Sequence, residues 1–199
     1  MTMNEYLILV NAEHPLKSTE PTDLVSVCAE YPDILIRREA QSALSTLLLA
    51  IGSGDRIVPV SGYRSRAEQV EIYESSLKEN GLEFTRKYVA LPGCSEHETG
   101  LAIDLALNEG EIDFICPDFP YDGICGDFRK AAADFGFIER YPKGKESVTG
   151  IGHEPWHFRY VGCPHARTIT ELALTLEEYI SSCPDKEKDY EKDKALSRN

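Results

Sequence analysis

The first part of the chain shows apolar side chains at helical spacing. Over residues 35–51 these side chains fall three or four positions apart and stop at Gly52, which predicts an amphipathic helix ended by glycine. Residues 56–60, with the sequence RIVPV, are typical of a short strand. Pro59 favours an edge position for this strand, because proline has no N–H to donate to a neighbouring strand.

Three further segments carry helical signals. A second helix is predicted to begin after Ser65, because Glu68 three residues later completes a capping box, and to end at Gly81. A short helix is predicted over residues 127–136 and an amphipathic helix over residues 167–182. Helices are therefore expected early and late in the chain.

The predicted strands lie mostly in the second half. Residues 100–107 and 112–116 are expected to pair across the turn NEGE, and residues 137–141 and 155–162 read as two more strands. Because strands and helices do not alternate regularly, the pattern favours an α+β fold over a repeating βαβ fold. One domain is expected, spanning residues 1–183.

Composition limits the partners and the location. The 199 residues carry 21 basic and 34 acidic side chains, a net charge of −13, which argues against nucleic acid or an anionic membrane as a partner. Residues 184–199 balance five acids with five bases and lack apolar periodicity, so we expect a disordered tail. The acidic Glu5 and a four-residue apolar run near the N-terminus do not make a secretory signal. These features predict a cytoplasmic protein whose six cysteines are free thiols.

The predicted strand 100–107 contains a carboxylate, Asp104. Alternating apolar side chains place one face of this strand in the core, and Asp104 shares the other face with Ala102 and Ala106, which are also apolar. A buried ionised carboxylate is costly unless something compensates its charge. Backbone and arginine hydrogen bonds would supply that compensation, and so would a metal ion.

Two histidines have the context to join this carboxylate in a metal site. His97 lies seven residues upstream, and His157 belongs to a predicted strand on which packing can fix its ring. Two imidazoles and one carboxylate suit Zn²⁺ and leave a fourth position open, as in catalytic zinc sites. His153 is the strongest competitor of His157, but it is interpreted as a non-ligand, as are His14 and His165.

Two charged residues are candidates for catalysis. Pro155 biases Glu154 away from helical geometry, so a bend is expected to bring Glu154 beside the metal rather than onto it. There a carboxylate can take a proton from water and pass it to a leaving amine; a fourth-ligand role or a surface salt bridge is the alternative. Arg64, just ahead of a predicted helix, has the chemistry to stabilise an oxyanion or bind a substrate carboxylate.

Three motifs occur in one order along the chain: SGYRS at residues 61–65, S-x-H-x-x-G-x-A-x-D at residues 95–104 and E-P-W-H-x-R-Y-V-G at residues 154–162. With these motifs the chain resembles the VanX/VanY-type D-alanyl-D-alanine peptidases over nearly its whole length, residues 9–183. The two longer motifs are specific in combination. The segment ALPGCSEHETGLAID looks most like the VanXY type, which combines dipeptidase and carboxypeptidase activity.

This resemblance implies a fold and a set of site residues. The fold is the one shared with the hedgehog signalling domain, in which helices pack around a small mixed or antiparallel sheet. One Zn²⁺ per chain is implied to be held by His97, Asp104 and His157. Glu154 is implied as the general base and acid, and Arg64 as the residue that stabilises the tetrahedral intermediate.

The resemblance also concerns substrate recognition. It implies Gln69 and Ser95 as residues that grip the terminal carboxylate of the substrate. Residues 115–126 fall where the VanXY type carries a loop that shapes substrate choice. Ser61 stands where that type has an acidic residue, so the preference for a dipeptide does not transfer directly.

The function implied by the resemblance is that of a cytoplasmic zinc D,D-peptidase. Its substrates would be D-Ala-D-Ala, the pentapeptide precursor of peptidoglycan, or both, and its action would protect against vancomycin-like glycopeptides. Small peptides ending in D-Ala-D-Ala are the expected partners. Two alternatives stay open: an L,D-carboxypeptidase that trims wall tetrapeptides, and a zinc-stabilised binding module without activity.

Overall fold

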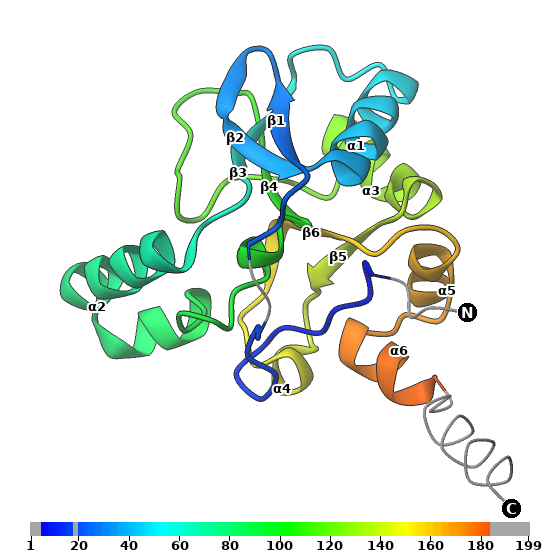
Figure 1. Ribbon diagram of the computed structural model, residues 1–199. Helices are drawn as coiled ribbons and strands as arrows, with labels where there is room; N and C mark the ends of the chain where they lie inside the picture. Colours follow the sequence, from blue (N-terminus) through cyan, green and yellow to red (C-terminus); the bar gives the residue numbers. More distant parts are fainter. Residues whose placement is uncertain (1–4, 18–19, 184–199) are drawn as a thin grey trace, which may run out of the picture.

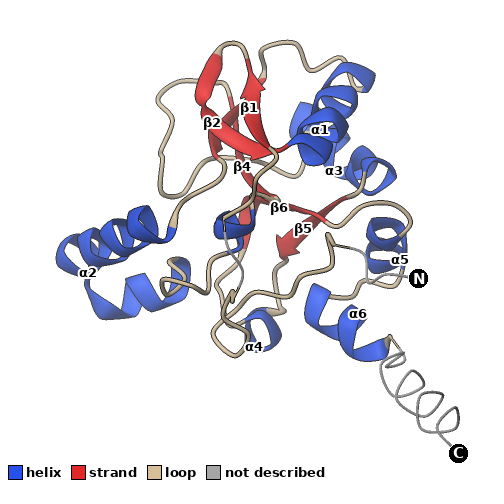
Figure 2. Cartoon of the chain, viewed as in Figure 1, coloured by secondary structure: helices blue, strands red, loops and turns tan. Residues whose placement is uncertain are grey.

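Six strands form two sheets within residues 5–17 and 20–183, the part of the chain that the computed structural model describes. The strands are β1 (Leu24–Cys28), β2 (Tyr31–Arg37), β3 (Ile57–Ser61), β4 (Ala102–Leu107), β5 (Phe137–Tyr141) and β6 (Glu154–Tyr160). The central sheet has the order β3-β4-β6-β5, and each neighbouring pair in it is antiparallel. Figure 2 shows the strands in red and the helices in blue. Strands β1 and β2 form a separate hairpin.

Helices lie around the central sheet (Figure 1). They are α1 (Arg38–Ala50), α2 (Arg66–Tyr88), α3 (Gly123–Ala132), α4 (Glu146–Thr149), α5 (His165–Glu171) and α6 (Leu176–Ser182), with 3₁₀ turns η1 (Glu96–Thr99) and η2 (Ala133–Phe135). Helices α1 and α3 contact each other beside the sheet, whereas α2 extends away from it on the other side. This is the expected α+β fold. Among the described helices, none combines the length and hydrophobicity needed to cross a bilayer.

One predicted helix begins later than expected, and one predicted strand is wrong. The helix predicted over residues 35–51 begins only at Arg38, because the residues before it complete β2, where Ile36 pairs with Val25 and is buried. Residues 112–116 do not form a strand. The Asp113 carboxylate accepts the backbone N–H groups of Ile115 and Cys116, a local turn that competes with pairing in a sheet.

The remaining helix predictions differ mainly at their ends. The capping box at Ser65 is present, and Gly81 interrupts α2 with a φ of 80°, although a second helical segment continues to the end of α2. The helix predicted over residues 127–136 starts earlier, as α3, and finishes as η2. The helix predicted over residues 167–182 is two helices, α5 and α6, separated by a turn in which Ala173 has a positive φ.

Several smaller predictions are confirmed. Strand β3, with Pro59, lies at an edge of the central sheet. The segments predicted as strands over residues 137–141 and 155–162 are β5 and β6. All six cysteines are free. The tail, residues 184–199, lies outside the described residues, and the single-domain boundary at residue 183 stays a prediction.

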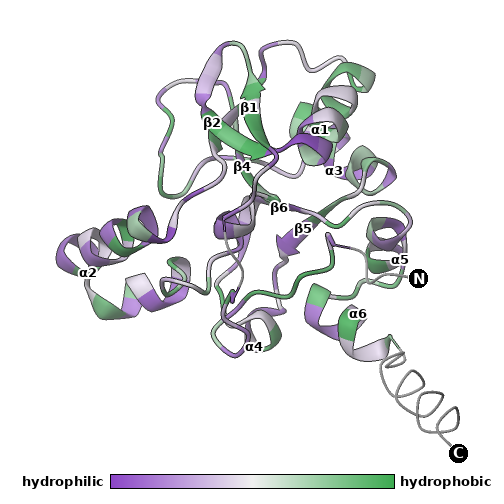
Figure 3. Cartoon of the chain, viewed as in Figure 1, coloured by the Kyte–Doolittle hydropathy of each residue, from purple (hydrophilic) through white to green (hydrophobic). Residues whose placement is uncertain are grey.

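The two faces of the central sheet differ in chemistry. Leu101, Ile103 and Leu105 are buried in the main hydrophobic core, into which α1 and α3 also pack. Phe158 of β6 joins them, with its ring 4.8 Å from that of Phe128. The opposite face carries polar groups instead. Hydrophilic residues also cover much of α2, the helix that extends from the sheet (Figure 3).

Gly62, directly after β3, approaches the hairpin too closely for a side chain. A Cβ atom there would lie 2.3 Å from the backbone oxygen of Leu35. We expect Gly62→Ala to lower the free energy of unfolding by about 1–3 kcal/mol, because the backbone must move to relieve the clash. Denaturant unfolding measures this change. The neighbouring variant Ser61→Ala adds no atoms and should stay near the wild type; equal stability of both variants would contradict the prediction.

Candidate metal and catalytic site

Pairing between β4 and β6 places Asp104 directly opposite His157. Residues opposite each other on antiparallel strands share a face and lie within reach of one another. Nδ1 of His157 is 2.9 Å from Oδ1 of Asp104. The two side chains are 53 positions apart in sequence, so the sheet register alone brings them together.

His97 reaches the same carboxylate from η1. Its Nε2 atom lies 3.1 Å from Oδ2 of Asp104, while its Nδ1 donates to the backbone oxygen of Gly62 at 2.6 Å. Gly100 ends η1 with a φ of 67° and turns the chain into β4. A side chain at Gly100 would be strained by this φ and would meet Leu24 at 2.8 Å. The glycine in the H-x-x-G motif therefore sets the approach of His97 to the strand.

His97, Asp104 and His157 have the geometry and chemistry of a metal site. One ligand atom from each lies within 4.8 Å of the others, and all three side chains are buried. The set of two imidazoles and one carboxylate fits zinc with an open coordination position. His153 and His165 lie outside this cluster and hydrogen-bond to tyrosines instead.

Opposing effects of burial and charge set the protonation of these three groups. Burial alone would raise the pKa of Asp104, but the two histidines hold it well below its usual value. Burial and the charge of Arg64 lower the pKa of His97 to about 4. Burial also disfavours the charged form of His157, yet its hydrogen bond to Asp104 and the nearby Glu96 carboxylate outweigh the effect of burial and raise the pKa to about 9. The aspartate is therefore ionised and His97 neutral near pH 7.

Glu154 reaches this site because the pairing of β5 with β6 is irregular. In a regular strand Glu154 would share the core-facing side of Phe158, but the register shifts between Glu139 and Tyr141, and such irregularities re-aim side chains. Oε2 of Glu154 lies 3.9 Å from Nδ1 of His157. Burial raises the pKa of Glu154 to about 8, although the charge of His157 opposes that rise. A carboxyl group that titrates near neutral pH can both accept and donate a proton.

Arg64 approaches the carboxylate from the end of β3. Its NH2 group is 3.7 Å from Oδ2 of Asp104, and its NH1 donates to Oε1 of Gln69 at 3.2 Å. Gln69 in turn donates from Nε2 to the backbone oxygen of Ala90. The structure therefore uses Gln69 to hold Arg64, a contact that the sequence did not predict. Ser95 is buried just before η1.

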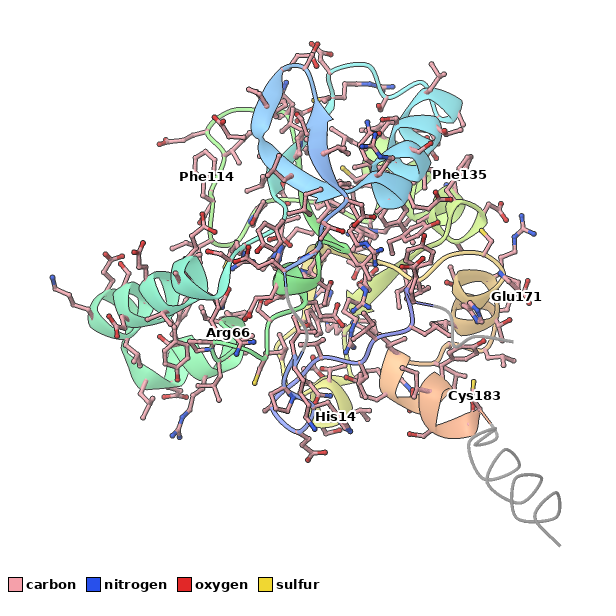
Figure 4. All side chains as sticks on the ribbon, viewed as in Figure 1. His14, Arg66, Phe114, Phe135, Glu171 and Cys183 are labelled. Carbon is pink, nitrogen blue, oxygen red and sulfur yellow. The ribbon has the colours of Figure 1, made fainter. Side chains whose placement is uncertain are left out.

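One pocket of about 250 Å³ collects these side chains. All seven residues singled out in the sequence line it: Arg64, Gln69, Ser95, His97, Asp104, Glu154 and His157. The loop between β4 and α3 adds Phe114 and Ile115, which are 77% and 52% exposed. Figure 4 shows Phe114 on this loop, on the side of the molecule from which α2 extends. The pocket thus combines a polar floor with an apolar rim.

Two aromatic residues of the pocket were not predicted from the sequence. Trp156 and Tyr141 line it, and the Tyr141 ring lies 4.9 Å from that of His157. Trp156 stands inside the motif E-P-W-H, where its position was a usable signal. Tyr141 ends a predicted strand, but nothing local indicated that the register shift would bring it beside a histidine.

Comparison with known proteins places the chain in a family. The family model described as VanY, D-alanyl-D-alanine carboxypeptidase, matches residues 33–163. The bifunctional D-Ala-D-Ala dipeptidase and D-Ala-D-Ala carboxypeptidase VanXYC of Enterococcus gallinarum is 47% identical, over 87% of this chain and 92% of the relative.

Solved structures show the same relationship. The vancomycin resistance D,D-dipeptidase VanXYg, in complex with a D-Ala-D-Ala phosphinate analogue, matches with a TM-score of 0.87 and 55% identity, over 89% of this chain and 72% of that one. The LD-carboxypeptidase LdcB matches with a TM-score of 0.74 and 36% identity, over 91% and 88%. A mutant of the D,D-pentapeptidase VanY from the VanB-type cassette, in complex with Zn(II), has a TM-score of 0.70 and 29% identity, over 88% and 99%. The chain therefore belongs to the VanY family of D-alanyl-D-alanine carboxypeptidases.

Proposed function

We propose that this chain is a cytoplasmic zinc D,D-peptidase that hydrolyses D-Ala-D-Ala, removes the last D-Ala from the pentapeptide precursor of peptidoglycan, or does both. Removal of these substrates would leave mainly wall precursors that do not end in D-Ala-D-Ala, and this would protect against vancomycin-like glycopeptides. The observation that carries the proposal is the single pocket that gathers a His-Asp-His cluster, Glu154 and Arg64. The similarity to VanXYC and VanXYg supports the choice of substrates, and both substrates occur in the cytoplasm.

Each residue of the pocket has a role in this proposal. His97, Asp104 and His157 hold one zinc ion per chain, which when bound polarises a carbonyl group and lowers the pKa of water. Glu154 takes a proton from the attacking water and delivers it to the nitrogen of the departing D-Ala. Arg64, kept in place by Gln69, stabilises the negative charge that develops on the scissile carbonyl oxygen.

Two groups of pocket residues are assigned to the two ends of the substrate. We assign Ser95 and Gln69 to recognition of the terminal carboxylate, because both lie in the pocket close to the metal ligands or Arg64. The exposed Phe114 and Ile115 lie on a loop at the same pocket, and we assign them to contacts with the longer, acyl side of the pentapeptide. Loops of this kind commonly set specificity around a rigid site.

The substrate panel is the first test. Purified zinc-loaded protein is incubated separately with D-Ala-D-Ala, a pentapeptide precursor ending in D-Ala-D-Ala, and the corresponding tetrapeptide, and released D-Ala is measured. We expect release from the first, the second or both, and little from the tetrapeptide. Metal analysis of the same sample should give one zinc per chain.

The tetrapeptide arm addresses the second candidate function. The similarity to the LD-carboxypeptidase LdcB, at 36% identity, favours an L,D-carboxypeptidase as the alternative. Cleavage of the tetrapeptide alone would establish that alternative and overturn the D,D-assignment. A zinc-loaded protein that cleaves none of the three peptides would favour the binding module.

The role of Glu154 can be separated from metal binding. Glu154→Gln should retain zinc, because Glu154 is not in the ligand cluster, but should lower kcat by about 10²–10⁴ through loss of proton transfer. Steady-state kinetics and metal analysis measure the two effects. Glu171→Gln, which changes an exposed carboxylate at the end of α5, is the control and should behave like the wild type. Near wild-type turnover in Glu154→Gln would remove Glu154 from the mechanism.

The metal-free protein should lose stability as pH rises from about 6.5 to 9. The pKa of His157 is raised to about 9 in the folded chain from 6.5, so its stabilising charge is present below pH 6.5 and lost as the pH passes through 9. The raised pKa of Glu154, about 8, acts in the same direction, since the folded state retains a proton that the unfolded chain releases.

Thermal unfolding in the presence of a chelator measures this trend, with a fall in Tm of a few degrees expected for each ~1 kcal/mol lost. The shift in Tm on adding zinc should grow over the same range, because metal binding displaces the proton from His157. The control His165→Gln lies outside the cluster and should keep both trends. A chelated protein whose Tm rises between pH 6.5 and 9 would contradict the assignment.

A further inference from the structure

A buried carboxylate with no role so far lies at the second nitrogen of the His157 ring. Glu96, the first residue of η1, is 1% exposed. Its Oε2 atom is 3.6 Å from Nε2 of His157. Both atoms are buried, and among the described residues neither has a hydrogen-bond partner within normal distance. A carboxylate acceptor and a ring N–H donor therefore face each other just beyond hydrogen-bonding distance.

Two arginines fix the orientation of this carboxylate. Oε1 of Glu96 is 2.7 Å from Nε of Arg140 and 2.8 Å from NH1 of Arg159, and both arginine side chains are fully buried. Glu177 binds the other end of Arg140 through two hydrogen bonds. The two arginines and two glutamates balance in charge. Glu96 is therefore held ionised, with one oxygen committed to the arginines and the other directed at His157.

The two histidines of the cluster are held in opposite ways. The Nδ1 of His97 donates to the backbone oxygen of Gly62, which leaves its Nε2 facing Asp104. The ring of His157 is reversed, because its Nδ1 faces Asp104 and its Nε2 faces Glu96. A ligand histidine generally donates its second N–H to a carboxylate or carbonyl group, which fixes both tautomer and orientation.

We propose that Glu96 is the positioning residue of His157: it accepts the Nε2–H of that ring and so presents Nδ1 to the metal ion. The proposal rests on the zinc site proposed above and extends it by one residue. A role limited to neutralising arginines would need only Oε1. It would leave Oε2 of Glu96 and Nε2 of His157 both buried and unpaired, an arrangement that costs free energy. Their pairing, after a small approach, satisfies both groups.

The tautomers of the zinc-loaded wild type give the first test. In protein with ¹⁵N-labelled histidine, two-bond ¹H–¹⁵N correlation spectra show which ring nitrogen carries the proton. We expect His97 to carry it on Nδ1 and His157 on Nε2. Signals from non-ligand rings are identified with the variants His14→Gln, His153→Gln and His165→Gln. A His157 ring that carries its proton on Nδ1 would overturn the proposal without need of a Glu96 variant.

A pair of matched variants gives the second test. Glu96→Gln keeps the shape of the side chain, but its amide has only one oxygen, so an NH2 group must face either His157 or the arginines. Glu177→Gln removes one charge from the same network without touching His157. Zinc affinity is measured by competition with a chromogenic chelator. We expect Glu96→Gln to bind zinc about 10–100-fold more weakly, and Glu177→Gln to bind it like the wild type.

The outcomes separate positioning from scaffolding. Equal losses in Glu96→Gln and Glu177→Gln would mean that the ion network acts only as a scaffold, and wild-type affinity in Glu96→Gln would also overturn the proposal. If Glu96→Gln does not fold, the tautomer of His157 in the wild type decides. Because both measurements report zinc binding and not hydrolysis, an absence of peptidase activity would refute the proposed function while leaving this result intact.

Discussion

The burial of the Asp104 carboxylate is the constraint on which the site depends. An ionised group removed from water must be surrounded by compensating charge, and here each neighbouring element supplies some. His157 comes from β6 on one side of β4, Arg64 follows β3 on the other, and His97 comes from η1, which leads into the strand. Because β4 lies between β3 and β6, its carboxylate at Asp104 has Arg64 on one side and His157 on the other.

Further buried ion pairs lie behind these groups and connect the site to distant parts of the chain. Arg159, on β6, faces Glu96 and also donates from NH2 to the backbone oxygens of Tyr6 and Ile8. Arg140, on β5, connects Glu96 to Glu177 at the start of α6. The segment before β1 and helix α6 are therefore linked through buried charges behind the proposed metal ligands. Stability and site geometry share the same ion pairs.

The sequence predicted the α+β fold class, and local motifs predicted the residues that meet in one pocket. His97, Gly100 and Asp104 lie within one 3₁₀ turn and the strand that follows it, so local geometry determines their relative positions. The β1-β2 hairpin was missed because the apolar residues that end β2 also suit the helical period of α1. The contact between Glu96 and His157 was beyond reach from sequence, since it depends on long-range register and on buried arginines. Glu154 was predicted beside the site through a bend at Pro155, and the irregular pairing with β5 falls on the part of β6 that contains this proline.

The separation of the ligands along the chain has a consequence for assembly. His97 and Asp104 are made together, but Asp104 and His157 are 53 positions apart, and α3 and β5 lie in the interval. A ribosome must complete that interval before the third donor exists. In the proposed zinc site, the set of ligands is therefore complete only late in synthesis, and an ion bound there would close the interval as a coordination crosslink in a protein whose six cysteines are free.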